Sequence, residues 1–253
     1  MSQAAALFAL NPGDYQRYRP DYPMELFRWV AQQCRQHERA LDIACGSGQA
    51  SEVWPAFFQQ VLACDLSFAS LQLSPEHSPV LYCQSPANAL PVSSHSIDLV
   101  SVAQGLHWFA TPAFYQEVRR VLRPQGIFCA WSYGLPVCAN AAVDAWIRCT
   151  HDQLLGPYWP AGREHVLNGY RDLPFPFAQR PAPVLGISRY WLPSELLGYI
   201  SSWSATAQYR QQRGDPLPQL AAQLEACWPQ ETPRLALEWP LTLLIGSPDW
   251  PVS

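Results

Sequence analysis

The sequence contains no lysine, and it is also poor in charge and in long apolar runs. All 16 basic residues are arginines, so no lysine is available to form a Schiff base or to act as a base. Charged residues make up 14% of the 253 residues, and the net charge of −4 comes without a dense basic stripe, which argues against nucleic acid as an obligatory partner. No apolar run approaches the roughly 20 residues of a membrane span, and the N-terminus lacks the pattern of a signal peptide. We therefore expect a cytoplasmic protein that does not enter membranes.

The sequence also lacks any CxxC pair among its eight cysteines. Neither a metal site nor a disulfide framework is therefore predicted, and free thiols in a reducing compartment are the simpler interpretation. Cys45, Cys64 and Cys83 follow one another at intervals of 19 residues, which indicates repeated strand–helix units of similar length.

Short apolar runs alternate with amphipathic stretches over the first half of the chain. Strands are expected at 40–44, 61–65, 80–83, 97–103 and 126–131, and helices at 24–37, 49–58, 67–73 and 112–122. Ser67 and Thr111 stand where the last two of these helices need an N-cap, and Pro112 suits a first helical turn. The alternation predicts an α/β protein in which helices cover both faces of a parallel sheet.

After residue 133 the alternation ends. A helix is expected at 139–155, and two late strands at 184–192 and 235–245 enclose helical segments at 194–201 and 217–227. The late strands suit an antiparallel pair at the sheet edge, with the helical excursion as a cap. We expect one continuous domain, made of an N-terminal lid and first helix (1–38), a cofactor-binding core (39–133) and a C-terminal part with the last strands and the substrate cap (134–253).

The segment ALDIACGSGQ at 40–49 is the most informative part of the chain. Gly46 and Gly48 follow an apolar run where a buried strand would turn into a helix, and they allow the backbone to approach a ligand closely. Asp65 ends the next apolar run 19 positions after Gly46, where a carboxylate in a doubly wound protein meets the hydroxyls of a ribose. The pattern predicts a nucleoside cofactor. A dinucleotide fingerprint would need Gly or Ala where Ser51 stands, so a nicotinamide-dependent reductase is the weaker alternative.

Several motifs resemble those of class I S-adenosylmethionine-dependent methyltransferases. The run DIACGSG at 42–48 is similar to the first motif of that family, D-x-(G/A)-x-G-x-G. Four further segments resemble the type 11 branch and, within it, relatives of trans-aconitate methyltransferase: YQRYRPDYP at 15–23, SPANALP at 85–91, AQGLHWF at 103–109 and FYQEVRRVLRPQG at 114–126. The resemblance implies a Rossmann-like, doubly wound, seven-stranded sheet in the order 3-2-1-4-5-7-6, with strand 7 antiparallel and a helical cap.

The resemblance also implies S-adenosyl-L-methionine as the cofactor and a set of residues that bind it. These residues are Tyr15, Arg19, Asp42, Ala44, Gly46, Gly48, Asp65, Leu66, Ala87, Asn88, Gln104 and Trp108. Three positions depart from the family pattern. Ala44 replaces a commoner glycine, Pro86 removes a backbone N–H beside the adenine, and Asn88 replaces a glutamate.

The chemistry expected of such a site is mainly alignment, because a sulfonium methyl group is already activated. His107 is the catalytic candidate, either as a base or as a group that orients the substrate, and its alternative role is structural packing beside Trp108. We expect a small-molecule acceptor, and a carboxylate is favoured by arginines in the presumed cap. Residues assigned to that cap include Arg163, Tyr170, Arg171 and Trp203. The alternatives are methylation of a hydroxyl, amine or carbon of another metabolite, and a cofactor-binding protein without turnover.

Overall fold

The computed structural model describes residues 18–248, which divide into two compact units. The sheet unit comprises Tyr22–Tyr133, His165–Leu185 and the residues from Leu241 onward. The helical unit comprises the residues up to Asp21, Gly134–Glu164 and Gly186–Pro240. Each unit has its own fold and is described separately.

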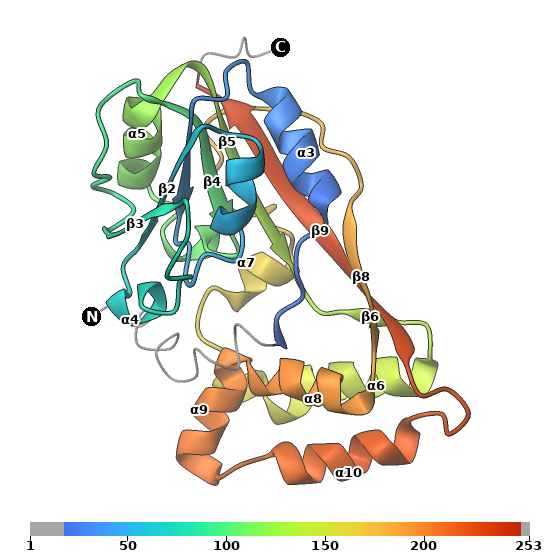
Figure 1. Ribbon diagram of the computed structural model, residues 1–253. Coiled ribbons are helices and arrows are strands. Elements are labelled where there is room, and N and C mark those ends of the chain that lie inside the picture. The colour runs from blue at the N-terminus through green and yellow to red at the C-terminus, as the bar shows by residue number, and fades with distance from the viewer. Residues whose placement is uncertain (1–17, 249–253) are drawn as a thin grey trace. The chain divides into compact units, whose positions relative to one another are not determined.

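The sheet unit is built on parallel strands (Figure 1). These are β1 (Arg39–Ile43), β2 (Gln60–Asp65), β3 (Leu81–Gln84), β4 (Ile97–Ala103) and β5 (Leu122–Tyr133), in the order β3-β2-β1-β4-β5. The last strand, β9 (Leu235–Ser247), continues the sheet beside β5 and is antiparallel to it. The predicted order and the antiparallel last strand are thus confirmed. Six of the seven residues of β4 are buried, as expected for a strand covered on both faces.

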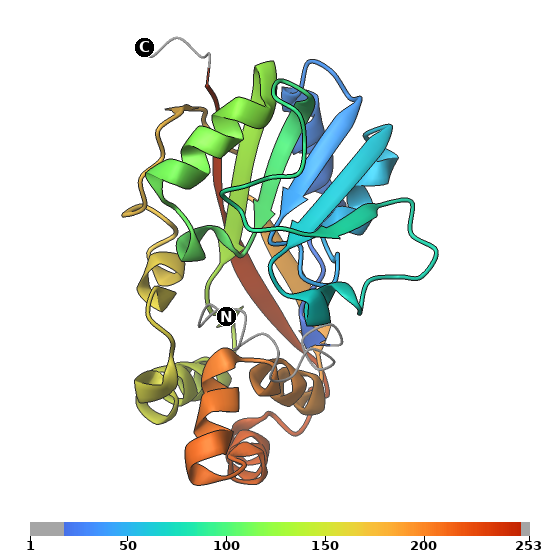
Figure 2. The same cartoon turned by 90° about the vertical axis from the view of Figure 1, so that its left-hand side faces the viewer.

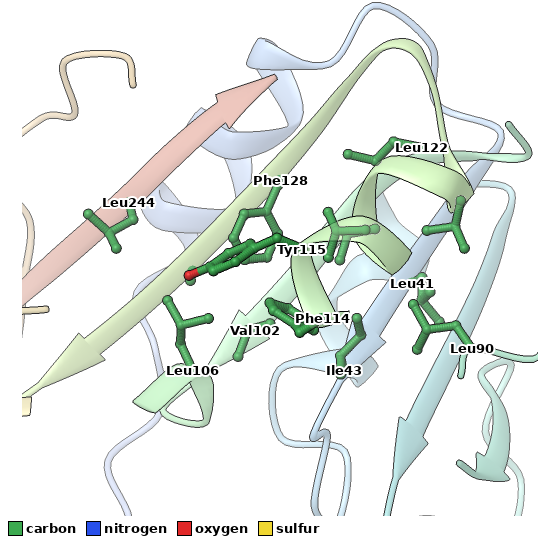
Figure 3. Packing of buried hydrophobic residues seen from close by; sticks show 14 of the residues in the cluster. Leu41, Ile43, Leu90, Val102, Leu106, Phe114, Tyr115, Leu122, Phe128 and Leu244 are labelled. Carbon is green, nitrogen blue, oxygen red and sulfur yellow. The ribbon is translucent and has the colours of Figure 1, made fainter. Parts of the chain in front are cut away.

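Two helices cover opposite faces of this sheet. Each face of the sheet has its own hydrophobic core. On one face Val100 and Val102 of β4 pack with α5 (Pro112–Val121), and on the other Leu99 packs with α3 (Met24–Gln33). Figure 3 shows Phe114 and Tyr115 of α5 in the first of these cores, with Phe128 of β5 beside them. The Thr111 hydroxyl caps α5 by accepting from the Phe114 N–H at 3.3 Å, as its position in the sequence predicts.

Three predicted helices of the sheet unit, at 24–37, 49–58 and 67–73, are shorter in the structure than expected. The segment 49–58 forms only a 3-10 helix, η1 (Ser51–Ala56), because Pro55 has no N–H to continue an α-helical ladder. Helix α3 ends at Gln33 rather than near residue 37, because Cys34 is extended and the His37 ring bonds the Ala31 carbonyl at 3.0 Å. The short helix after β2, α4 (Phe68–Leu71), has the predicted cap, since the Ser67 hydroxyl accepts from the Ser70 N–H.

The helical unit contains most of the second half of the chain. Its helices are α6 (Ala141–Cys149), followed by a π-turn (Thr150–Leu154) and η4 (Gly156–Tyr158), then α8 (Pro193–Ser201), α9 (Ser204–Arg213) and α10 (Leu217–Cys227). Helix α10 packs against α6 and α8. Strand β8 (Gly186–Trp191) pairs antiparallel with the first half of β9, as predicted for the two late strands.

The strand count differs from the expected seven. The sheet has nine strands because two short pieces, β6 (Val137–Cys138) and β7 (Ala178–Gln179), also pair with β9. Strand β9 has 13 residues, and its two halves belong to different units. β6 and β8 pair with the first half, and β5 and β7 pair with the second. Within residues 18–248, every helix is too short or too polar to cross a bilayer.

Candidate functional site

The carboxyl ends of the parallel strands bring the predicted site residues of the sheet unit to one edge of the sheet. Strand β1 pairs with β2 on one side and β4 on the other, so the chain order reverses at this point. In Figure 2 the parallel strands point toward the lower end of the sheet, where the loops after β1, β2 and β4 gather. Ligands of doubly wound proteins bind outside the carboxyl ends of the strands at such a reversal.

The turn after β1 requires glycine at a specific position. Ala44, Gly46 and Gly48 all have left-handed backbones, with φ of 56°, 58° and 94°. A Cβ built on Gly48 would lie 1.9 Å from the Tyr82 hydroxyl oxygen, whereas one built on Gly46 would meet no atom within 4 Å. Gly48 is therefore needed for close packing as well as for its backbone conformation.

Tyr82 and Glu52 hold this turn, and neither residue belongs to a motif that is visible in the sequence. The Tyr82 hydroxyl of β3 donates to Glu52 Oε1 at 2.6 Å, and the Ser78 hydroxyl donates to the same oxygen. Glu52 lies in η1, directly after the glycines. No local motif predicts this contact, because the two residues are 30 positions apart in the chain.

Asp65 closes the site on the side of β2. Its Oδ2 accepts from the Gly46 N–H at 2.8 Å, and its Oδ1 accepts from the Ser67 N–H at 2.7 Å. Burial raises the pKa of this carboxyl. The Leu66 N–H also bonds this carboxyl, and like the other two backbone bonds it lowers the pKa. A carboxylate offers about four lone-pair sites, so these backbone donors leave acceptor capacity for a hydroxyl group of a ligand.

Asp42 lies beneath the turn and is fully buried. Ser51 Oγ donates to its Oδ2 at 2.6 Å, and Ser101 Oγ of β4 donates to its Oδ1 at 2.7 Å. The Trp54 indole N–H donates in turn to Ser101 Oγ at 3.1 Å. Ser51, the residue that departs from the dinucleotide pattern, is thus the partner of a buried carboxylate. Any effect of Asp42 on the cofactor would pass through the turn that it supports.

Asp42 should make stability depend on pH. Burial is the largest cause that raises the pKa of Asp42 to about 6, so the folded protein binds a proton that the unfolded chain releases. The stabilisation by this bound proton is fully present at a pH below the pKa that Asp42 has in the unfolded chain, and it is lost as the pH rises through 6. Between pH 7 and pH 5 we expect the wild type to gain about 1 kcal/mol of unfolding free energy relative to Asp42→Asn. Urea unfolding at both pH values measures the difference, and equal changes in the two proteins would contradict this assignment.

The structure also explains why alanine is tolerated at position 44. A Cβ built on Gly105, after β4, would lie 3.0 Å from the Ala44 Cβ. The Ala44 methyl group therefore occupies space that the side-chain-free Gly105 leaves open. A left-handed alanine costs roughly 1–2 kcal/mol, which this packing partly offsets.

The loop after β4 carries Gln104, His107 and Trp108. Gln104 has a left-handed backbone (φ 61°), and its N–H donates to the Trp131 carbonyl at 2.8 Å. The next turn, η2 (Leu106–Trp108), places the His107 and Trp108 rings 4.6 Å apart. The Tyr170 hydroxyl lies 3.5 Å from His107 Nδ1. Tyr170 was expected in the cap, but the structure places it in the sheet unit beside His107.

The remaining predicted residues lie in different surroundings. Leu66 is 46% exposed directly after Asp65, Ala87 is half-buried, and Asn88 is exposed. Arg19 belongs to the helical unit, where its Cζ lies 5.3 Å from the centre of the Tyr199 ring. Tyr15 lies outside the described residues. Among residues 18–248 no group of three or more His, Cys, Asp or Glu side chains could hold a metal ion.

Comparison with known proteins gives a consistent result. A family described as "Methyltransferase domain" matches residues 41–130. A protein of Dictyostelium discoideum named as a methyltransferase is 30% identical over 210 residues, which cover 81% of this chain and 80% of the relative. A Saccharomyces cerevisiae protein named as an S-adenosylmethionine-dependent methyltransferase is 28% identical over 48% of this chain and 45% of its own length. A solved structure from Anaeromyxobacter dehalogenans, named as a type II methyltransferase, is 39% identical with a TM-score of 0.82, covering 90% of this chain and 97% of its own.

Proposed function

This chain belongs to the methyltransferase family, as a class I S-adenosylmethionine-dependent enzyme, and from this premise we propose that it methylates a carboxylate of a small acid. The product would be a methyl ester. The bound cofactor supplies an electrophilic methyl group on a positively charged sulfur. A carboxylate is already an anion at neutral pH, so the protein needs to align it and does not need to remove a proton.

The turn and Asp65 fit the cofactor. A Cβ on Gly46 would have no atom within 4 Å, so a side chain there would occupy space that is open to a ligand, and Asp65 retains acceptor capacity beside it. In the proposal, Asp65 accepts from a ribose hydroxyl and the backbone of Gly46 and Gly48 lines the amino-acid end. Leu66, Ala87 and Asn88 would border the adenine, and Gln104 and Trp108 the methionine side.

The observation that carries the acceptor class is an arginine stacked on an aromatic ring in the helical unit. Arg163 Cζ lies 4.6 Å from the centre of the Trp159 ring. The rings of Trp159 and Trp203 are 5.4 Å apart, those of Trp203 and Tyr199 are 5.5 Å apart, and Arg19 stacks on Tyr199. This aromatic row, which runs from Trp159 through Trp203 to Tyr199, therefore has an arginine at each end. Arg19 also donates from Nη2 to the Ser202 carbonyl at 3.3 Å. In the proposal, the N–H groups of the two guanidiniums pair with carboxylate oxygens of the acceptor.

Two arginines on one row suit an acceptor with more than one carboxylate. The motif resemblance to relatives of trans-aconitate methyltransferase supports the same class of acceptor. We further propose that the enzyme acts in the cytoplasm without a nucleic-acid partner, which its eight free thiols and its small net negative charge support.

A methyl-transfer screen tests the acceptor class. The protein is incubated with S-adenosylmethionine labelled in the methyl group and with small di- and tricarboxylic acids, phenols and amines. We expect label to enter an acid and to be released as methanol by mild base, as a methyl ester requires. Label that is stable to base, or that enters only phenols or amines, would overturn the carboxylate proposal.

Arg163→Gln provides the matched substitution, with Arg171→Gln as its control. We expect Arg163→Gln to raise the KM for the acid about tenfold or more, as loss of a charged hydrogen-bonding group predicts. Arg171 is exposed, and its guanidinium Nε donates to the Asn168 carbonyl at 3.0 Å, so its replacement should change KM little. Equal effects of the two substitutions would remove the support for acid recognition by Arg163.

A further inference from the structure

We propose that Tyr170 holds His107 in the tautomer that carries its proton on Nε2, so that His107 donates a hydrogen bond to the acceptor carboxylate. This inference rests on the proposed function and deepens it. It gives Tyr170 the part of a positioning residue that acts through His107, and it gives His107 a role other than that of a base.

The geometry of the pair supports this direction of the hydrogen bond. The Tyr170 hydroxyl and His107 Nδ1 are 3.5 Å apart, and the two rings are tilted by 34° at 6.2 Å. A phenol is a good O–H donor, and the unprotonated nitrogen of a neutral imidazole is a good acceptor. If Nδ1 accepts from Tyr170, the single proton of the neutral ring stands on Nε2. A distance of 3.5 Å is long for a hydrogen bond, and catalytic contacts commonly shorten when a substrate binds.

Tyr170 occupies its position at a conformational cost. Gly169 and Tyr170 both have left-handed backbones, with φ of 62° and 58°. A Cβ built on Gly169 would lie 2.8 Å from Thr242 Oγ1 of β9, so the turn packs tightly against that strand. The Tyr170 N–H donates to the His165 carbonyl at 2.8 Å, and the tyrosine is 1% exposed. Bulky residues rarely adopt this conformation, and such strain collects at functional sites.

A hydroxyl acceptor and a carboxylate acceptor need different tautomers of His107. A hydroxyl acceptor would have to lose its proton, and a histidine with a bare Nε2 could take it. A carboxylate acceptor loses no proton, because one of its oxygen lone pairs forms the new O–C bond while the pair of the broken S–C bond remains on sulfur. An N–H at Nε2 would orient that carboxylate, and the Nε2 proton would stay on the ring throughout.

Nitrogen NMR of histidine-labelled protein reads the tautomer directly. Long-range proton–nitrogen spectra are recorded on the full chain loaded with S-adenosylhomocysteine, at a pH where the His107 ring is neutral. His107→Gln identifies the His107 signals by their disappearance. We expect the Nε2–H tautomer in the wild type and a shift toward Nδ1–H in Tyr170→Phe. An Nδ1–H tautomer in the wild type, or no change in Tyr170→Phe, would overturn the inference.

Tyr115→Phe is the matched control. Tyr115 is 2% exposed in the same unit, and its hydroxyl donates to the Pro174 carbonyl. Its replacement removes a buried hydroxyl without touching His107, so we expect the tautomer to remain Nε2–H. A loss of Nε2–H in this variant would show that the tautomer responds to general loosening of the core, which would overturn a specific role for Tyr170.

Kinetics with the acid found in the methyl-transfer screen separate this inference from the proposed function. We expect Tyr170→Phe to raise the KM for the acid several-fold, with a smaller change in kcat. His107→Gln keeps a side-chain N–H donor and should retain more activity than His107→Ala. Base-labile label together with an Nδ1–H tautomer would overturn this inference alone. An Nε2–H tautomer without any labelled acid would overturn the proposed function and the bond from His107 to a carboxylate, while the control of the tautomer by Tyr170 would stand.

Discussion

Replacing Gly48 by alanine should lower the unfolding free energy by about 2–5 kcal/mol and abolish binding of S-adenosylhomocysteine. The added Cβ would lie 1.9 Å from the Tyr82 hydroxyl oxygen and 2.8 Å from Tyr82 Cζ. Tyr82 cannot easily withdraw, because its hydroxyl is bonded to Glu52. The left-handed backbone at φ 94° adds a second penalty for any side chain. Urea unfolding measures the stability change, and calorimetric titration measures the loss of binding.

Gly46→Ala is the matched control for this prediction. Gly46 has a left-handed φ of 58°, but a Cβ there would meet nothing within 4 Å. We therefore expect only the conformational cost of roughly 1–2 kcal/mol. A second test is Gly48→Ala combined with Tyr82→Ala, because the three nearest atoms to the new Cβ all belong to Tyr82. The double variant should lose less stability than the sum of the two single variants. Similar losses in Gly46→Ala and Gly48→Ala, or simple additivity, would refute the steric explanation.

Asp65→Ala should weaken binding of S-adenosylhomocysteine by about a hundredfold or more. In the proposed complex the carboxylate accepts from a ribose hydroxyl, and a hydrogen bond to a charged group contributes about 1.5–3 kcal/mol. The substitution also removes the acceptor for the Gly46 and Ser67 N–H groups, so the glycine turn loses an anchor. Isothermal titration of the purified variant gives the affinity directly.

Asp65→Asn removes part of each contribution. The amide keeps the size of the side chain and one acceptor oxygen, so it can accept from either the Gly46 or the Ser67 N–H but not from both. We expect both the affinity and the stability to lie between those of the wild type and Asp65→Ala. Wild-type affinity in Asp65→Ala would show that the ribose is held elsewhere.

The fold could be predicted to a large extent because its determinants are local. Residues 99–103 alternate between the two buried faces of a strand, and Thr111 and Pro112 have the residue types that begin a helix. The exceptions also have local causes. Pro55 shortened one helix, and the extended backbone at Cys34 ended another. The additional strands β6 and β7 have two residues each, too few to form a periodic pattern.

The sequence by itself determined the glycine turn and the alternation of strands and helices, and the resemblance of its motifs to those of class I methyltransferases implied the order of the strands and the type of methyl donor. Those features depend on backbone preferences and on motifs within a few neighbouring residues. Only the tertiary structure decided that Ser51 bonds a buried Asp42, that Tyr82 packs on Gly48, and that Tyr170 lies beside His107. In the last two contacts the partners are more than 30 residues apart, and in the first they meet only because the turn folds back over β1. Such pairings depend on how separate elements pack, and no local pattern along the chain records them.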